Sequence, residues 1–252
     1  MFRKLWLVLG ICSAFVMCMT APASAQVQEK PPRYVYVSNW VFPRSQWPKA
    51  VPGDSKQFDA LIANGTINGY GYDANAVHTP DGWTHDNWWS STSMAGLFDC
   101  LSALEKGNGA ENSLLESATK HWDNVLESRY YDVKPGTVNS GYLYVSVYTL
   151  RKNAPDNAMD ILGKGVVGPL MHKLFEEGIV SEWELDAQAI ATNNPATFVI
   201  VWVLPNASGL DKTRAAMDAA FKANPLIGPT FESMVHLKDH RSELGSAYAV
   251  YK

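Results

Sequence analysis

The residues of this chain that could carry chemistry gather between positions 73 and 89. His85 is followed directly by Asp86 and Asn87, and His78 precedes them across a predicted turn. A histidine next to a carboxyl group can bind a proton, a polar ligand or a metal ion. We take His85, Asp86 and Asn87 as candidate catalytic residues. The candidate ligand-binding residues are Asp73, His78, His85, Asn87 and Trp89.

The same segment also fits an exposed or edge strand whose histidine has its hydrogen bonds satisfied. His78 and His85 are separated by a turn, which is not a recognised ligand spacing, so we expect no metal site. The chain has no G-x-S-x-G motif, no phosphate-binding glycine loop and no H-E-x-x-H motif. These absences argue against hydrolase, kinase and zinc-protease functions.

A second group of acidic residues alternates along one predicted strand. Glu182, Glu184 and Asp186 fall on one face, and Trp183 and Leu185 fall on the other. Carboxyl groups that perform acid-base chemistry must lie at a pocket with shifted pKa values. The simpler expectation for this row is a sheet face in contact with solvent.

The chain contains an internal repeat. Residues 34–38 (YVYVS) reappear as residues 142–146 (YLYVS), and residues 61–79 align with residues 174–192. Residues 84–97 then align with residues 197–210 in the same order. Ordered blocks with matching spacing indicate that one unit has been duplicated.

The two copies differ in their third strand. In the second copy residues 198–203 are apolar on both faces, whereas residues 85–90 of the first copy are largely polar. Polar groups at positions that are core in the sister copy are costly to bury unless they are paired. We therefore expect a polar pocket in the first copy.

Each copy has the pattern strand, helix, strand, strand, helix, strand, which is the ferredoxin-like α+β unit. We place the first unit at residues 26–133, a linker at 134–141 and the second unit at 142–252. The predicted strands are 34–40, 67–77, 84–92 and 128–133 in the first unit, and 142–146, 180–190, 197–204 and 247–251 in the second. The predicted helices are 58–63, 97–104, 168–177 and 210–223.

A tandem of two such units resembles the dimeric α/β-barrel superfamily. The resemblance implies two sheets that pack face to face and close one barrel within the chain; two domains side by side are the alternative. It also implies a pocket between sheet and helices or inside the barrel. Related families include haem proteins with a histidine ligand. The resemblance thus makes His121 and His240 candidate cofactor-binding residues, although their matched positions fit helix capping or packing equally well.

The N-terminus predicts export. Arg3 and Lys4 precede an apolar run over residues 5–19, and residues 23–25 read Ala-Ser-Ala, which is typical of a signal peptide cleaved after Ala25. We expect a periplasmic or secreted protein with no membrane anchor. Cys100 is the one cysteine of the mature chain, and we expect it to be a buried core residue. A net charge of −4 argues against a nucleic-acid partner.

These patterns predict an exported protein that binds a small, partly apolar ligand. The resemblance implies that the ligand lies in a barrel pocket, with an oxygenase-like reaction and either haem or no cofactor. The alternative is a non-catalytic binding or scaffolding module that uses a surface rich in tryptophan, formed by Trp83, Trp88 and Trp89. An internally closed barrel predicts a monomer or a weak homodimer.

Overall fold

The structure is a computed structural model that describes residues 27–43, 45, 55–78, 82–107, 117–192 and 195–252. The predicted signal peptide, residues 1–25, lies outside the described residues. Within these ranges, no helix combines the length and the apolar character needed to cross a membrane.

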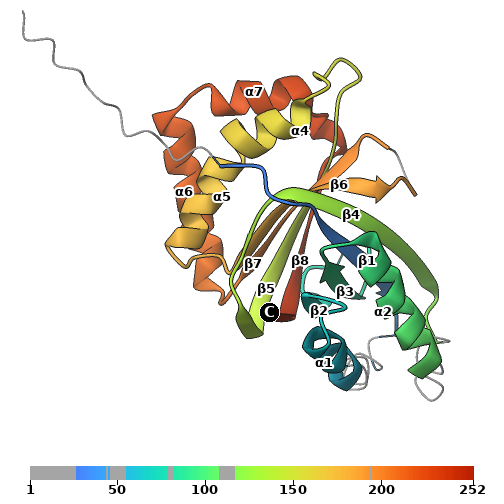
Figure 1. The fold of residues 1–252 in the computed structure, drawn as a ribbon. Coiled ribbons are helices and arrows are strands. Elements are labelled where there is room, and N and C mark those ends of the chain that lie inside the picture. Colours follow the sequence, from blue (N-terminus) through green and yellow to red (C-terminus); the bar gives the residue numbers. More distant parts are fainter. Residues whose placement is uncertain (1–26, 44, 46–54, 79–81, 108–116, 193–194) are drawn as a thin grey trace, which may run out of the picture.

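Each half of the chain folds into one β-α-β-β-α-β unit, as the repeat predicts (Figure 1). Gly65 and Gly178 follow the first helix of each unit with φ angles of +81° and +68°, which glycine adopts without strain. The first unit consists of β1 (Arg33–Val41), α1 (Ser55–Ala63), β2 (Gly69–Asn75), β3 (His85–Ser91), α2 (Met94–Gly107) and β4 (Lys120–Val133). The second consists of β5 (Gly136–Thr149), α5 (Gly168–Glu176), β6 (Glu182–Ile190), β7 (Thr197–Leu204), α6 (Ser208–Ala223) and β8 (Arg241–Tyr251).

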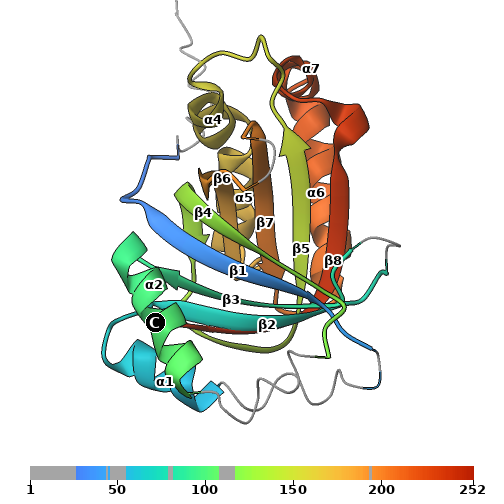
Figure 2. The ribbon, with the colours of Figure 1, turned by 90° about the vertical axis from the view of Figure 1, so that its right-hand side faces the viewer.

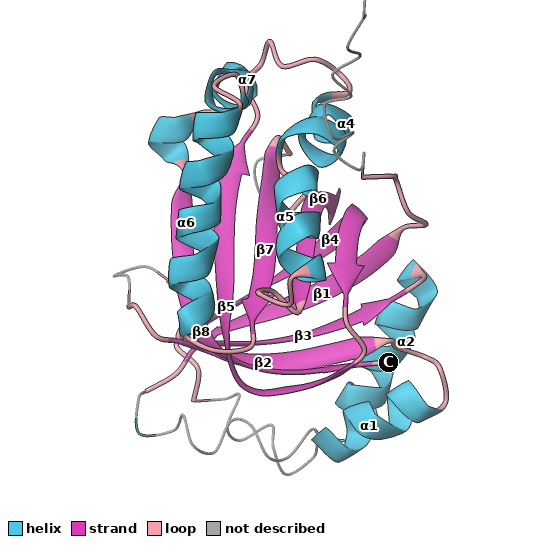
Figure 3. Cartoon of the chain, turned by 90° about the vertical axis from the view of Figure 1, so that its left-hand side faces the viewer, coloured by secondary structure: helices cyan, strands magenta, loops and turns pink. Residues whose placement is uncertain are grey.

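The second unit carries helices that the sequence did not predict. Helix α4 (Ala158–Ile161) continues into a π-helical turn, η2 (Leu162–Val166), directly before α5. Helix α7 (Ile227–Met234) and the short η3 (Leu237–Asp239) stand between α6 and β8. These additions enlarge the helical layer over the second sheet, as Figure 3 shows.

The eight strands close into one antiparallel barrel in the order β1-β3-β2-β8-β5-β7-β6-β4, with β4 paired back to β1. The two units join along the pairs β2 with β8 and β4 with β6. Figure 2 shows the strands of the first unit crossing those of the second at a steep angle. The predicted intramolecular barrel is therefore confirmed, and the side-by-side arrangement is wrong.

Two predicted boundaries differ from the structure. Strand β4 begins at Lys120 rather than Ser128, and β5 begins at Gly136, so most of the expected linker 134–141 is strand. The start of β4 contains the polar residues Asp123 and Asn124. They interrupt the alternation of apolar and polar residues by which a strand is recognised in the sequence. The connection between the units consists of Lys134 and Pro135.

The helices cover the outer face of the barrel, and two apolar cores lie beneath them (Figure 3). In the first unit the outward side chains Tyr36, Tyr70 and Trp89 pack against α1 and α2. Cys100 of α2 is fully buried in this core, as predicted, and burial raises the pKa of its thiol to about 12. A thiol in this state is an apolar filler rather than a nucleophile.

The inner faces of all eight strands enclose a lumen. Glu182, Glu184 and Asp186 of β6 face this lumen and are between 1% and 4% exposed, so the prediction of a solvated sheet face is wrong. The physical reason is barrel closure: the sheet face opposite the helices is covered by the other sheet instead of by water. The three acidic residues do share one face of β6, as the alternation predicts, but that face is buried in the lumen.

Candidate functional site

The predicted cluster of the first unit is divided between the two faces of the sheet. Successive residues of a strand point to opposite faces. Asp73 and Asp86 therefore face the lumen, whereas His85, Asn87 and Trp89 face the outer side. His78 follows β2 and is exposed. The structure thus does not bring these residues together in one pocket.

The outward residues of the cluster have contacts that account for their presence. His85 packs edge-on against Phe42 with ring centroids 5.8 Å apart, and burial lowers its pKa to about 4. Asn87 accepts a hydrogen bond of 2.9 Å from the indole of Trp40. Trp89 is 1% exposed and stacks on Tyr36 at 4.3 Å. These are packing and positioning contacts beneath or beside the helices.

The three tryptophans of the alternative hypothesis are buried. Trp83, Trp88 and Trp89 are 4%, 7% and 1% exposed. Trp83 and Trp88 line the lumen, and Trp89 lies in the core. They cannot form the exposed contact surface that a scaffolding module would need.

The two candidate haem ligands lie outside both cavities described below. His121 belongs to β4, not to a helix; its Nε2 atom lies 2.8 Å from Ser38 Oγ and its ring stacks on Trp40 at 3.7 Å. His240 follows η3, where its Nδ1 atom lies 2.7 Å from the carbonyl oxygen of Leu237. Among the described residues that line the two cavities there is no histidine. These two residues therefore do not fit a haem site there.

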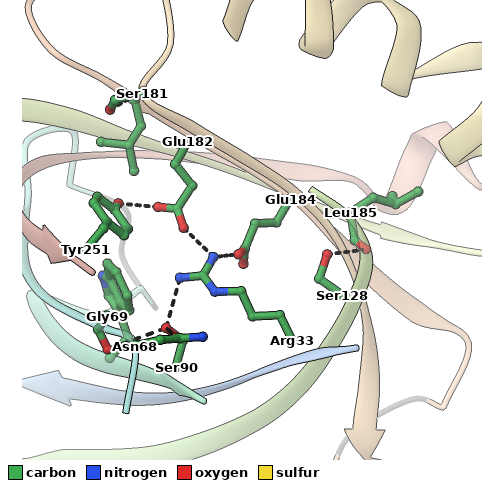
Figure 4. A network of polar contacts seen from close by, with 12 residues as sticks. Arg33, Asn68, Gly69, Ser90, Ser128, Ser181, Glu182, Glu184, Leu185 and Tyr251 are labelled. Atoms are coloured by element: carbon green, nitrogen blue, oxygen red, sulfur yellow. Dashed lines mark hydrogen bonds and ion pairs between the residues drawn. The ribbon is translucent and has the colours of Figure 1, made fainter. Parts of the chain in front are cut away.

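A network centred on Arg33 fills one end of the lumen (Figure 4). The guanidinium group of Arg33 forms ion pairs with Glu182, at 2.5 Å, and with Glu184, and donates a hydrogen bond of 2.9 Å to Ser90. The Tyr251 hydroxyl donates to Glu182 from the opposite side. Arg33 is 3% exposed, so its positive charge is stabilised by the surrounding protein groups and not by water.

A second acidic group lies further along the lumen. Asp73 of β2 and Asp86 of β3 are register partners, and the Trp88 indole donates a hydrogen bond of 3.1 Å to Asp73. The Trp83 indole donates a hydrogen bond of 2.7 Å to Glu243 of β8. Both units therefore contribute carboxyl groups to one interior.

Burial shifts the titration of these carboxyl groups. Desolvation raises the pKa of Asp73 and of Asp186 to about 7. Desolvation, reinforced by the charge of Asp73, raises the pKa of Asp86 well above its ordinary value. The pKa of Glu182 is also raised by burial, although Arg33 opposes the shift. A lumen with this composition holds exchangeable protons near neutral pH.

The space that remains in the lumen is a cavity of about 140 Å³. Its lining combines the acidic residues with the tryptophans Trp83, Trp88 and Trp122 and with a row of valines. The valines are Val35 and Val37 of β1, Val145 and Val147 of β5, and Val199 and Val201 of β7.

A second and larger cavity, of about 280 Å³, lies outside the barrel in the second unit. Its floor is formed by Tyr148 of β5 and by Ile200 and Trp202 of β7, and helices cover it. The covering residues are Val166 and Val167, Leu170 and Met171 of α5, Met217, Ala220 and Phe221 of α6, Ile227, Gly228, Phe231 and Glu232 of α7, and Leu237.

Trp202, which lines this cavity, has a buried polar atom without a partner. The residue is 6% exposed, its ring stacks on Tyr144 at 4.4 Å, and its indole Nε1 has no hydrogen-bond acceptor among the described residues. A buried donor in this state costs roughly 1–3 kcal/mol, and a bound acceptor would remove that cost. The cavity lies in the second unit, whereas comparison of the two copies had favoured the first.

Sequence reasoning missed several of these residues. Arg33 precedes the first strand by one position in the predicted boundaries and was not considered as a lumen residue. Trp202 lies in the segment 198–203, which the sequence predicts to be an apolar strand of the core. The repeat itself carried a usable signal, because Trp202 aligns with Trp89, and only Trp89 has an acceptor, the carbonyl oxygen of Leu97.

Comparison with known proteins identifies the fold. The sequence matches no family model and no curated protein. The structure is similar to a proposed monooxygenase from Lactobacillus acidophilus NCFM, with a TM-score of 0.61 and 12% identity over 88% of this chain and 97% of that one. It is also similar to an anthrone oxidase-like protein, with a TM-score of 0.55 and 12% identity over 89% of this chain and 95% of that one.

A third similar structure is a proposed monooxygenase from Fusobacterium nucleatum subsp. nucleatum, with a TM-score of 0.52 and 9% identity over 89% of this chain and 96% of that one. At such identities the likeness establishes the fold alone. The chain is a tandem ferredoxin-like protein with the architecture of the dimeric α/β barrels.

Proposed function

We propose that this chain binds a small, largely apolar molecule with one hydrogen-bond acceptor in the cavity between the second sheet and helices α5 to α7. Most of the lining side chains are aliphatic or aromatic, so an apolar ligand would replace water there favourably. The volume of about 280 Å³ suits a compact ring system rather than an extended chain.

The unpartnered indole of Trp202 carries this proposal. Nε1 of an indole is only a donor, so the ligand atom that meets it must be an acceptor such as a carbonyl oxygen. Tyr148 lies on the same floor, and burial raises the pKa of its hydroxyl, which therefore stays protonated at neutral pH. A cyclic ketone or a quinone combines the apolar body and the acceptor that this cavity requires.

Within this proposal, the reaction class is oxygenase-like. The support is the similarity of the fold to two proposed monooxygenases and to an anthrone oxidase-like protein. Glu232 of α7 is the carboxyl group among the described lining residues and is the group that would accept a proton from a bound substrate.

The test compares 1,4-naphthoquinone with naphthalene, which has the same ring system but no acceptor. Thermal shift and tryptophan fluorescence of the mature protein should show binding of the quinone that is at least tenfold tighter. Trp202→Phe should remove this preference, whereas Trp122→Phe, in the lumen, should keep it. Equal binding of both compounds, or an unchanged preference in Trp202→Phe, would refute the proposal.

Catalysis is tested separately from binding. Oxygen consumption is followed with hydroquinone and anthrone-type substrates, with and without added haem or flavin. Turnover that is lost in Glu232→Gln but retained in Glu177→Gln, on the exposed end of α5, would support the oxygenase assignment. Binding without oxygen consumption would leave a ligand-binding protein and reject the oxygenase.

A further inference from the structure

The lining of the lumen cavity combines apolar and acidic side chains. The apolar ones are mainly valines from β1, β5 and β7, of which Val145, Val147, Val199 and Val201 are only partly buried. Carboxyl groups from β3, β6 and β8 lie on the strands next to them, as Asp186 pairs with Val199. A cavity lined by both kinds of side chain matches a molecule that has a carbon skeleton and a positive charge.

Among the described residues, three buried carboxyl oxygens of lining residues have no hydrogen-bond partner, and one of them, Oε1 of Glu184, forms an ion pair with Arg33. The other two are Oδ1 of Asp86 and Oδ1 of Asp186, and these residues are 5% and 1% exposed. Both side chains line the same cavity. Since buried acceptors are normally paired, Oδ1 of Asp86 and Oδ1 of Asp186 indicate a donor that the described part of the chain does not supply.

The cations of the lumen do not satisfy these oxygens. The Nη1 and Nη2 atoms of Arg33 contact Glu182, Glu184 and Ser90, and no hydrogen bond joins Arg33 to Oδ1 of Asp86 or of Asp186 in the described structure. Arg241 contacts Glu243 at 3.4 Å and its side chain is 63% exposed. The carboxyl groups that line the cavity therefore outnumber the cations among its described lining residues, which are Arg33 and Arg241.

The arrangement favours an organic cation over a metal ion. Among the described residues, no group of three or more acidic, histidine or cysteine side chains has the geometry to hold a metal. Trp83, Trp88 and Trp122 line the cavity instead, and indole faces attract ammonium groups. Trp122 and Thr197 are partly exposed lining residues, so the cavity reaches solvent at their end of the barrel.

We propose that the barrel lumen is a binding site for a small alkylammonium or arylammonium ion, whose charged group lies between Asp86 and Asp186 and whose carbon skeleton packs on the lining valines. This site is separate from the helix-covered cavity, and it contains residues of both units. It gives the closed barrel a binding role in addition to its structural one.

The probe is n-butylammonium, and 1-butanol is its neutral control. Isothermal titration calorimetry on the mature protein should show saturable binding of the amine and none of the alcohol at the same concentrations. Butyrate, which carries the opposite charge, should not bind. Equal binding of the alcohol and the amine would overturn the proposal, as would tighter binding of Mg²⁺ or Ca²⁺ or the absence of any binding at millimolar amine.

Variants separate recognition from folding. Asp186→Asn and Asp86→Asn should each weaken n-butylammonium binding more than tenfold, whereas Asp99→Asn on the exposed face of α2 should bind normally. Val199→Phe narrows the cavity without changing its charge and should also abolish binding. Unchanged binding in the two lumen Asn variants, with melting temperatures near that of the parent protein, would overturn the proposal. Trp202→Phe should retain amine binding, so the two proposals fail independently.

Discussion

Asp73 and Asp86 lie opposite each other on the neighbouring strands β2 and β3, and both carboxyl groups belong to the lumen. The two groups form a hydrogen bond, which requires a proton on one of them. Desolvation raises the pKa of Asp73 to about 7 and raises that of Asp86 well above its ordinary value. The barrel interior is thus built to hold a partly protonated carboxyl pair.

This pair predicts that the free energy of unfolding decreases as the pH rises from about 5 to 8.5. A carboxyl group whose pKa is higher in the folded state binds more protons there than in the unfolded chain, so stability is lost as the pH rises through the folded pKa. Urea unfolding at pH 5.5, 7 and 8.5 measures the slope. Asp73→Asn should make the slope shallower, since Asp186 still contributes. A free energy of unfolding that increases with pH over this range would contradict this account.

Arg33 is predicted to be the most sensitive charged residue of the lumen. Arg33→Met leaves Glu182 and Glu184 buried without a cation, and removing one partner of a buried pair costs about 3–5 kcal/mol. Urea unfolding of the variant measures this loss. Combining Arg33→Met with Glu182→Gln and Glu184→Gln should restore much of the lost free energy of unfolding, because no unpaired charge then remains at these positions.

The matched control for Arg33 is Arg129→Met. Arg129 forms two ion pairs, with Glu29 and Glu127, but its side chain is 50% exposed. Exposed pairs contribute about 0–1 kcal/mol. An Arg33→Met effect as small as that of Arg129→Met would show that the lumen network does not hold the barrel together.

The sequence predicted the repeat and the order of the elements because both follow from local patterns, whereas the closed barrel was implied by the resemblance to the dimeric α/β barrels. Residues 197–204, for example, are a β-branched run that forms β7 with the predicted bounds. Strand alternation also placed Glu182, Glu184 and Asp186 on one face. The pattern could not show whether this face contacts water or another part of the barrel.

The candidate site was harder to predict because it depends on pairing between distant strands. Arg33 meets Glu182 only after β4 joins β6 to close the barrel. Likewise, successive residues of the polar segment 85–87 point alternately into the lumen and toward the outer layer. The neighbouring candidate residues His85 and Asp86 therefore lie on opposite faces of the sheet. No sequence pattern could show that the indole Nε1 of Trp202 lacks an acceptor among the described residues, because this depends on which groups lie near it in the folded protein.

Gly71 is predicted to be required for the packing of the lumen. A Cβ atom at this position would lie 2.5 Å from the indole of Trp88, which has little room to move because its Nε1 bonds Asp73. Gly71→Ala should therefore destabilise the protein by about 1–3 kcal/mol through overpacking. Gly228→Ala in α7 meets nothing within 4 Å and should be neutral or slightly stabilising. Thermal unfolding compares the two, and similar melting temperatures would argue against close packing at Trp88.

The predicted cleavage after Ala25 has a structural consequence at the start of the described chain. Val27 is 6% exposed and belongs to the core of the second unit, and the backbone of Lys30 bonds Arg129 of β4. We expect bacterial expression of the whole sequence to yield an exported protein whose mass corresponds to a start at Gln26. A variant that begins at Arg33 should then unfold at a lower temperature than this product, because it lacks Val27 and the ion pair of Lys30 with Asp132. Recovery of the uncleaved chain from the cytoplasm would contradict export, and equal melting temperatures would show that residues 27–32 do not stabilise the second unit.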